Sequence, residues 1–123
     1  MVEHDGFYPP QLAQQLIDPP VPFAWAAQTA EDTVVFLEEL DLWVGWLTQR
    51  YRLDHRIVPA CWAQHPELIE ELSALHLSWQ GSFATTAGHD APLLWHERFA
   101  HARTRIADWV ARTGCRPDNH RDR

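Results

Sequence analysis

The chain of 123 residues has only two cysteines, and a histidine follows closely after each. Cys61 precedes His65 by four residues, and Cys115 precedes His120 by five. Two sulfurs and two imidazole nitrogens are a ligand set that zinc prefers in closed tetrahedral sites. A site with four protein ligands is structural, because hydrolytic chemistry needs a position that is open to water. The two Cys-His pairs therefore predict a structural zinc site.

Other interpretations of the same cysteines stay open. Neither Cys-His pair contains the Cys-x2-Cys knuckle that many zinc sites use. One alternative is a disulfide between Cys61 and Cys115, and another is a pair of unlinked thiols with His120 on the surface. His55 lies in the connector that precedes Cys61 and is a reserve ligand.

Motifs of the common enzyme classes are missing from the sequence. His96 and His101 flank a zinc-protease-like segment, but they are five residues apart and not four. At 100° per residue they diverge by about 140°, so they cannot bind one metal from one helical face. The chain also has no glycine-rich phosphate loop and no G-x-S-x-G elbow. We therefore expect a non-enzymatic protein.

The first helical pattern covers residues 31–52. Thr29 can cap its start, where acidic residues favour the positive end of the helix dipole. Apolar residues follow helical spacing along one face: Phe36, Leu40, Trp43, Leu47 and Tyr51. A second apolar strip on this helix consists of Val35, Leu42 and Trp46. One apolar strip is enough to pack α-helical residues against the core of a small bundle. We therefore expect the second strip to bind a protein partner or a second copy of the chain.

Two more helices are predicted from their start and stop signals. The second helix begins at Pro66, since proline is favoured at the first helical position. The third begins after Asp90, the expected cap, and runs to about Thr113, where Gly114 ends it. Short connections between three helices favour an all-α antiparallel bundle over residues 31–123.

This topology has a consequence for the two Cys-His pairs. In an antiparallel bundle, the second helix begins at the end of the molecule where the third helix stops. One pair lies just before the second helix and the other just after the third. The four predicted ligands should therefore meet, and a zinc ion would staple the polar C-terminal tail to the bundle.

Residues 1–30 are predicted to form an N-terminal arm. They contain five of the nine prolines, which prevents a long helix. The arm also holds four aromatic residues, more than a solvated tail would carry: Phe7, Tyr8, Phe23 and Trp25. We expect part of the arm to lie against the bundle or against a partner.

Charge is distributed unevenly along the chain. Residues 1–95 hold three arginines and thirteen acidic residues, a net charge of −10, whereas residues 96–123 hold seven arginines and four acidic residues, a net charge of +3. The acidic bulk repels phosphate backbones, so we do not expect nucleic acid as the main partner. The alternative function is a DNA-associated accessory or regulatory protein that uses the basic C-terminal end. Its candidate phosphate contacts are Arg112, Arg116, Arg121 and Arg123.

The sequence predicts a cytoplasmic location. No window approaches the roughly 18 to 20 apolar residues of a membrane span, and the acidic start is unlike a signal peptide. Cysteines in a reducing compartment are usually thiols or metal ligands.

Four short motifs carry a resemblance to a known family. They are Cys-Trp-x2-His-Pro at 61–66, Leu-x-Ala-Leu-x3-Trp at 72–79, Trp95-His96, and Cys115 with the trailing His120. In this order they resemble a family of small Trp- and His-rich actinobacterial proteins of unknown function found on plasmids, integrative elements and phages. The resemblance covers roughly residues 31–120 and implies an accessory role in a mobile element. Together with the apolar strip, it predicts a non-enzymatic, protein-binding accessory domain.

Overall fold

The computed structural model describes residues 17, 20–22, 24–117 and 119–121. These residues form three α-helices and no strand: α1 (Ala30–Arg50), α2 (Pro66–Ser82) and α3 (Ala91–Thr113). Two short 3-10 helices precede α1 and α2: η2 (Trp25–Ala27) and η3 (Trp62–Gln64). The predicted all-α fold with three helices is confirmed.

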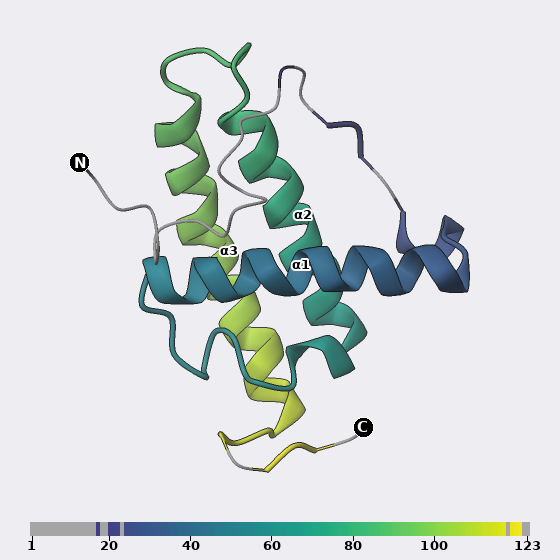
Figure 1. The fold of residues 1–123 in the computed structure, drawn as a ribbon. Helices are drawn as coiled ribbons and strands as arrows, with labels where there is room; N and C mark the ends of the chain where they lie inside the picture. Colours follow the sequence, from purple (N-terminus) through teal and green to yellow (C-terminus); the bar gives the residue numbers. More distant parts are fainter. Residues whose placement is uncertain (1–16, 18–19, 23, 118, 122–123) are drawn as a thin grey trace, which may run out of the picture.

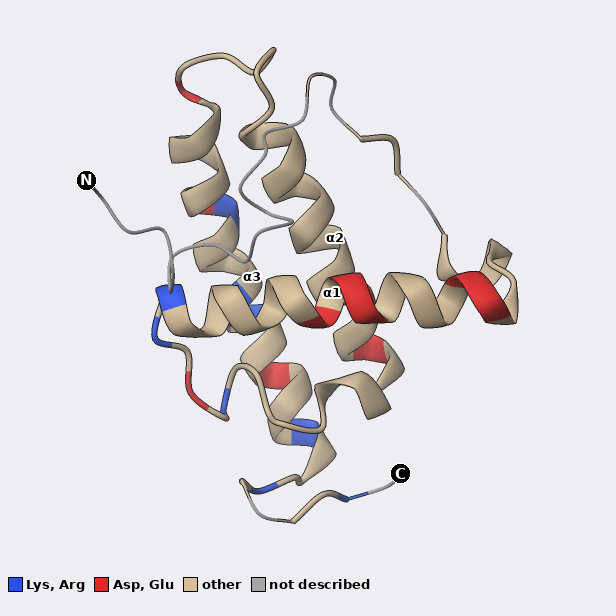
Figure 2. Ribbon diagram, in the orientation of Figure 1, with Lys and Arg blue, Asp and Glu red and all other residues tan. Residues whose placement is uncertain are grey.

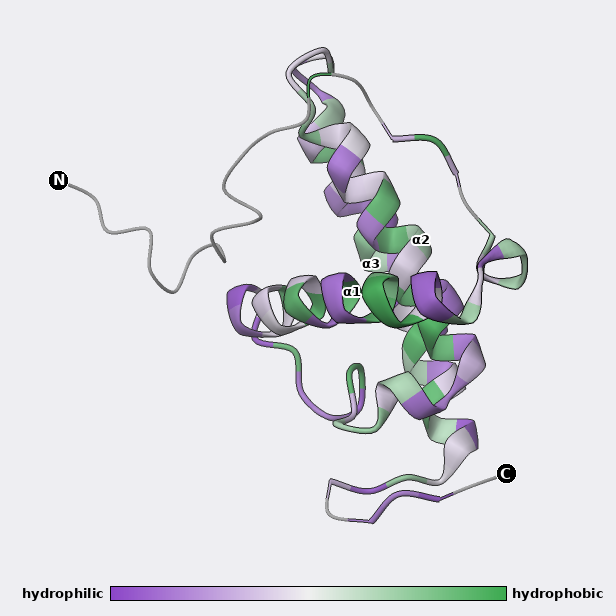
Figure 3. Cartoon of the chain, turned by 45° about the vertical axis from the view of Figure 1, so that its right-hand side comes forward, coloured by the Kyte–Doolittle hydropathy of each residue, from purple (hydrophilic) through white to green (hydrophobic). Residues whose placement is uncertain are grey.

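The three helices form a hairpin with a helix lying across it. α2 and α3 run antiparallel, side by side, and α1 crosses both of them (Figure 1). The same crossing is visible from a second direction (Figure 3). The C-terminal segment lies near the start of α2, below the end of α3 (Figure 1). The start of α2 and the end of α3 lie at the same end of the hairpin, and one Cys-His pair adjoins each of them. The meeting of the two pairs therefore does not depend on the direction of α1.

One hydrophobic core joins the three helices, and its centre is aromatic. Trp43 of α1, Trp95 of α3 and Leu68 of α2 are fully buried in this core. Five of the seven tryptophans belong to the buried cluster: Trp43, Trp46, Trp62, Trp79 and Trp95. None of the helices in the described part of the chain is long and apolar enough to cross a membrane.

The helix ends follow the sequence signals, with one exception. Thr29 caps α1, because its Oγ1 accepts a hydrogen bond of 3.0 Å from the backbone N–H of Asp32. Gly114 ends α3 in the left-handed conformation, with φ of 74°. The expected side-chain cap at Asp90 is wrong. The Asp90 backbone is already helical, so its carbonyl oxygen accepts from Leu94 N while its carboxylate makes no cap bond.

The second apolar strip on α1 is only partly exposed. Val35 and Leu42 lie on the surface, 51% and 45% exposed, as predicted for a partner-binding strip. Trp46 is 6% exposed and belongs to the core, so its assignment to the partner surface is wrong. Residue 46 follows Trp43 by three positions and shares its side of the helix. The crossing of α1 over the hairpin buries both indoles, with the Trp46 ring 5.1 Å from that of Trp79.

Part of the predicted arm lies against the helices. Trp25 donates a hydrogen bond of 2.9 Å from Nε1 to Ser73 Oγ on α2. Its ring also meets Phe36 of α1 edge to face, at a centroid distance of 6.5 Å. This contact confirms the expectation for Trp25. Phe7, Tyr8 and Phe23, like most of residues 1–19, lie outside the described residues.

Candidate metal centre

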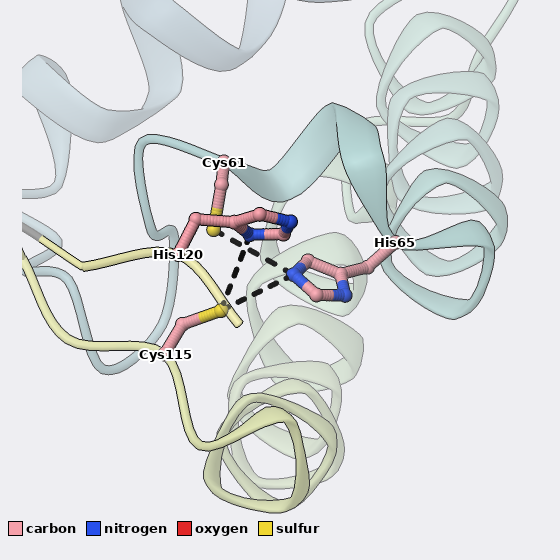
Figure 4. Close-up of side chains that lie close together, drawn as sticks. All are labelled: Cys61, His65, Cys115 and His120. Atoms are coloured by element: carbon pink, nitrogen blue, oxygen red, sulfur yellow. Dashed lines mark hydrogen bonds between the residues drawn. The ribbon is translucent and has the colours of Figure 1, made fainter. Parts of the chain in front are cut away.

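The four predicted ligands come together at one end of the α2–α3 hairpin. Cys61 and His65 approach from the segment before α2, and Cys115 and His120 approach from the segment after α3 (Figure 4). One ligand atom of each residue, two sulfurs and two ring nitrogens, lies within 4.8 Å of the other three. The prediction that the topology gathers these residues is confirmed.

The first pair is held by η3 and the start of α2. Cys61 is the residue before η3, and its carbonyl oxygen accepts a hydrogen bond of 2.9 Å from Gln64 N. Buried Trp62 anchors this turn in the core. His65 closes η3 and precedes Pro66, and its carbonyl oxygen accepts the first backbone hydrogen bonds of α2. With 5% exposure, His65 is a buried polar residue whose ring faces the two sulfurs.

The second pair depends on the way α3 ends. Left-handed Gly114 turns the chain out of the helix, directly before Cys115. Buried Thr113 fixes this turn, because its Oγ1 donates to the Val110 carbonyl at 2.6 Å and accepts from Cys115 N at 3.1 Å. The direction of the Cys115 side chain is therefore set by the helix end.

A tight turn brings His120 back to Cys115. Arg116 and Asn119 exchange two backbone hydrogen bonds, of 3.0 and 3.1 Å. The backbone N–H of Arg121 then donates to Cys115 Sγ at 3.2 Å. This N–H stabilises negative charge on the sulfur, the form in which cysteine binds metal.

Three sulfur–nitrogen distances within the cluster fit a tetrahedral metal site. His65 Nε2 lies 3.6 Å from Cys61 Sγ and 3.3 Å from Cys115 Sγ. His120 Nδ1 lies 3.4 Å from Cys115 Sγ. A tetrahedral zinc ion with bonds of about 2.3 Å to sulfur and about 2.0 Å to nitrogen separates sulfur from nitrogen by about 3.5 Å. The three contacts therefore have the spacing of atoms that share one ion.

One hydrogen bond from His65 cannot serve both sulfurs equally well. His65 Nε2 lies near both sulfurs, yet a ring nitrogen carries one hydrogen and donates well to one acceptor at a time. A cation at the centre would accept lone pairs from all four ligand atoms at once. The cluster thus has the donor set and the spacing to hold a metal ion, and the four side chains named above are the ones that would bind it.

The two thiols differ in acidity. Burial raises the pKa of the Cys115 thiol, but hydrogen bonds outweigh it and lower the pKa to about 6, first the one from Arg121 N–H and then those from Cys61 and His65. Burial raises the pKa of Cys61, and the neighbouring Cys115 raises it further. Cys115 is therefore the sulfur that is more readily a thiolate at neutral pH, and a metal would have to displace the proton of Cys61.

The structure has no disulfide between Cys61 and Cys115, and of the second alternative it has the unlinked thiols but not the surface position of His120. Both cysteines are free thiols, and His120 is half-buried and faces Cys115 instead of the solvent. His55, the reserve ligand, is exposed and is not part of the four-residue cluster. His96 hydrogen-bonds through Nε2 to the Tyr51 hydroxyl at 2.9 Å, away from this cluster.

Three of the four candidate phosphate contacts lie on the last turn of α3 and on the described part of the tail. Figure 2 shows arginine at these positions. Arg112, Arg116 and Arg121 are exposed, and the Arg112 guanidinium lies over the Trp109 ring at 5.1 Å from its centroid. Arg123 lies outside the described residues. A metal ion bound by the cluster would hold the tail in place. It would therefore also fix how far Arg116 and Arg121 lie from the end of α3.

Two supporting residues at this site were not predicted from the sequence. Thr113 acts through its side-chain hydroxyl and Arg121 through its backbone N–H. Neither contributes to a recognisable ligand spacing. The position of Thr113, directly before a helix-ending glycine and a cysteine, is the one local signal that could have indicated a role in the turn.

The chain matches no protein-family model, no curated protein and no solved structure.

Proposed function

We propose that Cys61, His65, Cys115 and His120 bind one zinc ion in a structural site. Two sulfurs and two nitrogens, within 4.8 Å of one another, are a donor set that zinc prefers, whereas magnesium and calcium prefer oxygen ligands. Four protein ligands fill the coordination sphere and leave no position for a catalytic water. The ion would tie the tail to the start of α2, so that its binding energy contributes to folding.

Metal analysis of the purified protein tests this assignment. We expect about one zinc ion per chain in the wild type and almost none in Cys61→Ser or Cys115→Ser. His101→Ala is the matched control, because His101 is exposed and outside the cluster. Cobalt substitution should give the intense visible absorption of tetrahedral thiolate coordination. The proposal would be contradicted if the purified protein contained no metal and if neither chelator nor added zinc changed its melting temperature.

We further propose that the protein is a non-enzymatic domain that binds another protein. This proposal rests on the apolar strip of α1. Of its three predicted residues, Trp46 is buried in the core, whereas Val35 and Leu42 are exposed. The strip that can bind a partner therefore consists of Val35 and Leu42. Exposed apolar side chains that share one helix face are typical of docking surfaces. The resemblance of the motifs adds an accessory role in an actinobacterial plasmid, integrative element or phage.

Site-specific crosslinking tests protein binding directly. A photoreactive amino acid replaces Leu42 in one variant and Thr104, an exposed residue of α3, in a control variant. In cells of an actinobacterial host we expect one predominant crosslinked protein at position 42 that is absent at position 104. A crosslink to a second copy of the chain would make the partner a homodimer, which light scattering would confirm. Equal labelling at both positions would contradict the proposal.

A second candidate function is contact with DNA through the basic tail. It is favoured by Arg112, Arg116 and Arg121, which are exposed on the last turn of α3 and on the tail that follows it. If the candidate is correct, binding weakens steeply with salt, and replacing Arg116 and Arg121 by alanine flattens that dependence. The acidic remainder of the chain opposes such binding, so we expect no complex with duplex or single strands at low salt.

A further inference from the structure

A cavity of about 220 Å³ lies between α1, α2 and the half-buried Trp25. Trp25 and Phe36 contribute aromatic rings to its wall, and His76 contributes an imidazole. Glu39 from α1 and Ser73 from α2 also line it. None of the four residues of the metal centre lines this cavity, so it is a separate feature of the fold.

The aromatic wall of the cavity has a fixed geometry. The rings of Trp25 and Phe36 stand at 83° to each other, with their centroids 6.5 Å apart. The hydrogen bond from Trp25 Nε1 to Ser73 Oγ, 2.9 Å long, holds the indole in this orientation. The third ring, His76, is stacked on buried Trp43 at 4.6 Å and cannot swing freely. The wall therefore includes aromatic rings of fixed orientation, and aromatic rings attract cations.

The cavity is negatively charged. Glu39 is the one charged residue among those that line it, and its exposed carboxylate makes no ion pair within the described residues. Burial lowers the pKa of His76 to about 4, so the imidazole carries no charge at neutral pH. An entering cation would meet aromatic rings and a carboxylate, and none of the described residues that line the cavity carries a positive charge at neutral pH.

We propose that this cavity binds an arginine side chain of a partner protein, an inference that rests on the protein-binding function proposed above. A guanidinium group can lie on an aromatic face and pair with a carboxylate at the same time. The cavity supplies both, from Trp25, Phe36 and Glu39. Its apolar walls also suit the aliphatic stem of the arginine.

The cavity borders the exposed apolar strip of α1. Glu39 lies four residues after Val35 and three before Leu42, spacings that make helix residues neighbours on the surface. A partner whose apolar residues cover the strip would therefore bring an adjacent arginine to the cavity.

The charge of α1 favours a basic partner over a second copy of the chain. The helix carries five acidic residues, which form bands along the part of α1 away from Arg50 (Figure 2): Glu31, Asp32, Glu38, Glu39 and Asp41. Two copies that met through this surface would place like charges together, which is unfavourable. A basic helix or peptide would have complementary charge.

Binding of a short peptide tests the proposal. The probe is acetyl-Leu-Arg-Leu-amide, and its matched control replaces arginine by citrulline, which has nearly the same shape and no charge. The readout is the indole N–H signal of Trp25 in a proton–nitrogen NMR titration. We expect this signal to shift with the arginine peptide, and the citrulline peptide to bind about fivefold more weakly.

Two isosteric variants locate the binding site. Glu39→Gln should weaken the arginine peptide about fivefold, whereas Glu38→Gln, which removes an exposed charge outside the cavity, should change affinity by less than about twofold. Circular dichroism shows whether both variants keep the wild-type fold.

Three results would overturn the cavity proposal. They are an unmoved Trp25 signal at about 10 mM peptide, equal binding of the two peptides, and equal losses in the two variants. The last would assign binding to the general charge of α1. Crosslinking at Leu42 is independent of this titration. If the crosslink forms and the peptide does not bind, only the cavity proposal is wrong.

Discussion

The aromatic centre of the fold and its metal end differ in what holds each in place. At the centre, Trp43 and Trp95 are 0% exposed and lie among other large apolar side chains. At the metal end the tail is mostly exposed and polar, and hydropathy colouring shows few hydrophobic positions in it (Figure 3). Its order comes from hydrogen bonds around Cys115 and from the four clustered side chains.

This difference separates two sources of stability in a small protein. Buried apolar area stabilises the centre by roughly 25 cal/mol per Å², independently of any ligand. The tail has little such area, so binding of the proposed zinc ion would supply much of the free energy of ordering it. We therefore expect the centre to fold without metal and the tail to require it.

Replacing Trp43 by alanine is expected to have the largest effect. Trp43 is fully buried, and its ring contacts those of Trp46, His76 and Trp79. Loss of a buried aromatic side chain costs about 3 to 5 kcal/mol, because the cavity left behind collapses only partly. Urea unfolding followed by circular dichroism measures this loss. Trp109→Ala, at a half-buried position, is the control and should cost less.

Removing the metal should act mainly on the tail. A metal present at about 100 times its dissociation constant stabilises the folded state by about 3 kcal/mol, and a chelator removes this contribution. Hydrogen exchange should then become faster in residues 115–121 and remain slow in the middle of α1. Cys115→Ser should show the same pattern without chelator. Faster exchange throughout α1 would show that the metal also holds the aromatic centre.

Acid should weaken the centre through His76. Burial lowers the pKa of His76 from 6.5 to about 4, so below pH 6.5 the unfolded chain binds a proton that the folded chain does not. Neutral His76 therefore imposes no loss of folding stability above pH 6.5, and the free energy of unfolding decreases as the pH falls from 6.5 towards about 4. Each pH unit corresponds to about 1.4 kcal/mol, so the free energy of unfolding should fall by about 2 kcal/mol between pH 6.5 and about 5.

A variant isolates this effect from the other titrating groups. His76→Phe keeps a ring to stack on Trp43 and has no proton to bind. Urea unfolding of both proteins at both pH values, with chelator present, removes any change in metal binding from the comparison. If the wild type and the variant lose the same stability on acidification, His76 does not carry the predicted effect.

Local signals made much of the fold predictable from the sequence. Thr29, Pro66 and Gly114 mark helix ends by their own chemistry, and the structure has helix ends at all three. The metal centre was predictable for a different reason. It depends on the antiparallel order of α2 and α3 alone, and the two Cys-His pairs flank that hairpin.

Features that depend on how elements pack were not predictable. The burial of Trp46 follows from the crossing of α1 over the hairpin, which no pattern within α1 specifies. The cavity beside Trp25 requires a hydrogen bond to Ser73, 48 residues away. Asp90 has the residue type of a cap, but its backbone conformation was set by the loop before α3.

The ends of α1 and α3 give a last contrast between the two regions. α3 ends at Gly114 with φ of 74°, and α1 is followed by Arg52 with φ of 55°. Both residues are in the left-handed region, where a side chain costs about 1 kcal/mol and glycine does not. The N–H of Leu53 donates to the Thr48 carbonyl at 3.0 Å, the bond pattern of a helix end that usually has glycine.

Replacing Arg52 by glycine should therefore stabilise the protein slightly, by up to about 1 kcal/mol, because strain is removed while the flexible unfolded chain offsets part of the gain. Arg52 is exposed and its side chain has no hydrogen bond or ion pair within the described part of the chain, so no contact is lost. Gly114→Ala should have the opposite sign, since its new Cβ would lie 3.1 Å from Cδ of Arg121 and the backbone would be strained beside Cys115. Thermal unfolding of the two variants beside the wild type measures both signs. A lower melting temperature for Arg52→Gly would mean that the end of α1 tolerates its left-handed arginine without strain.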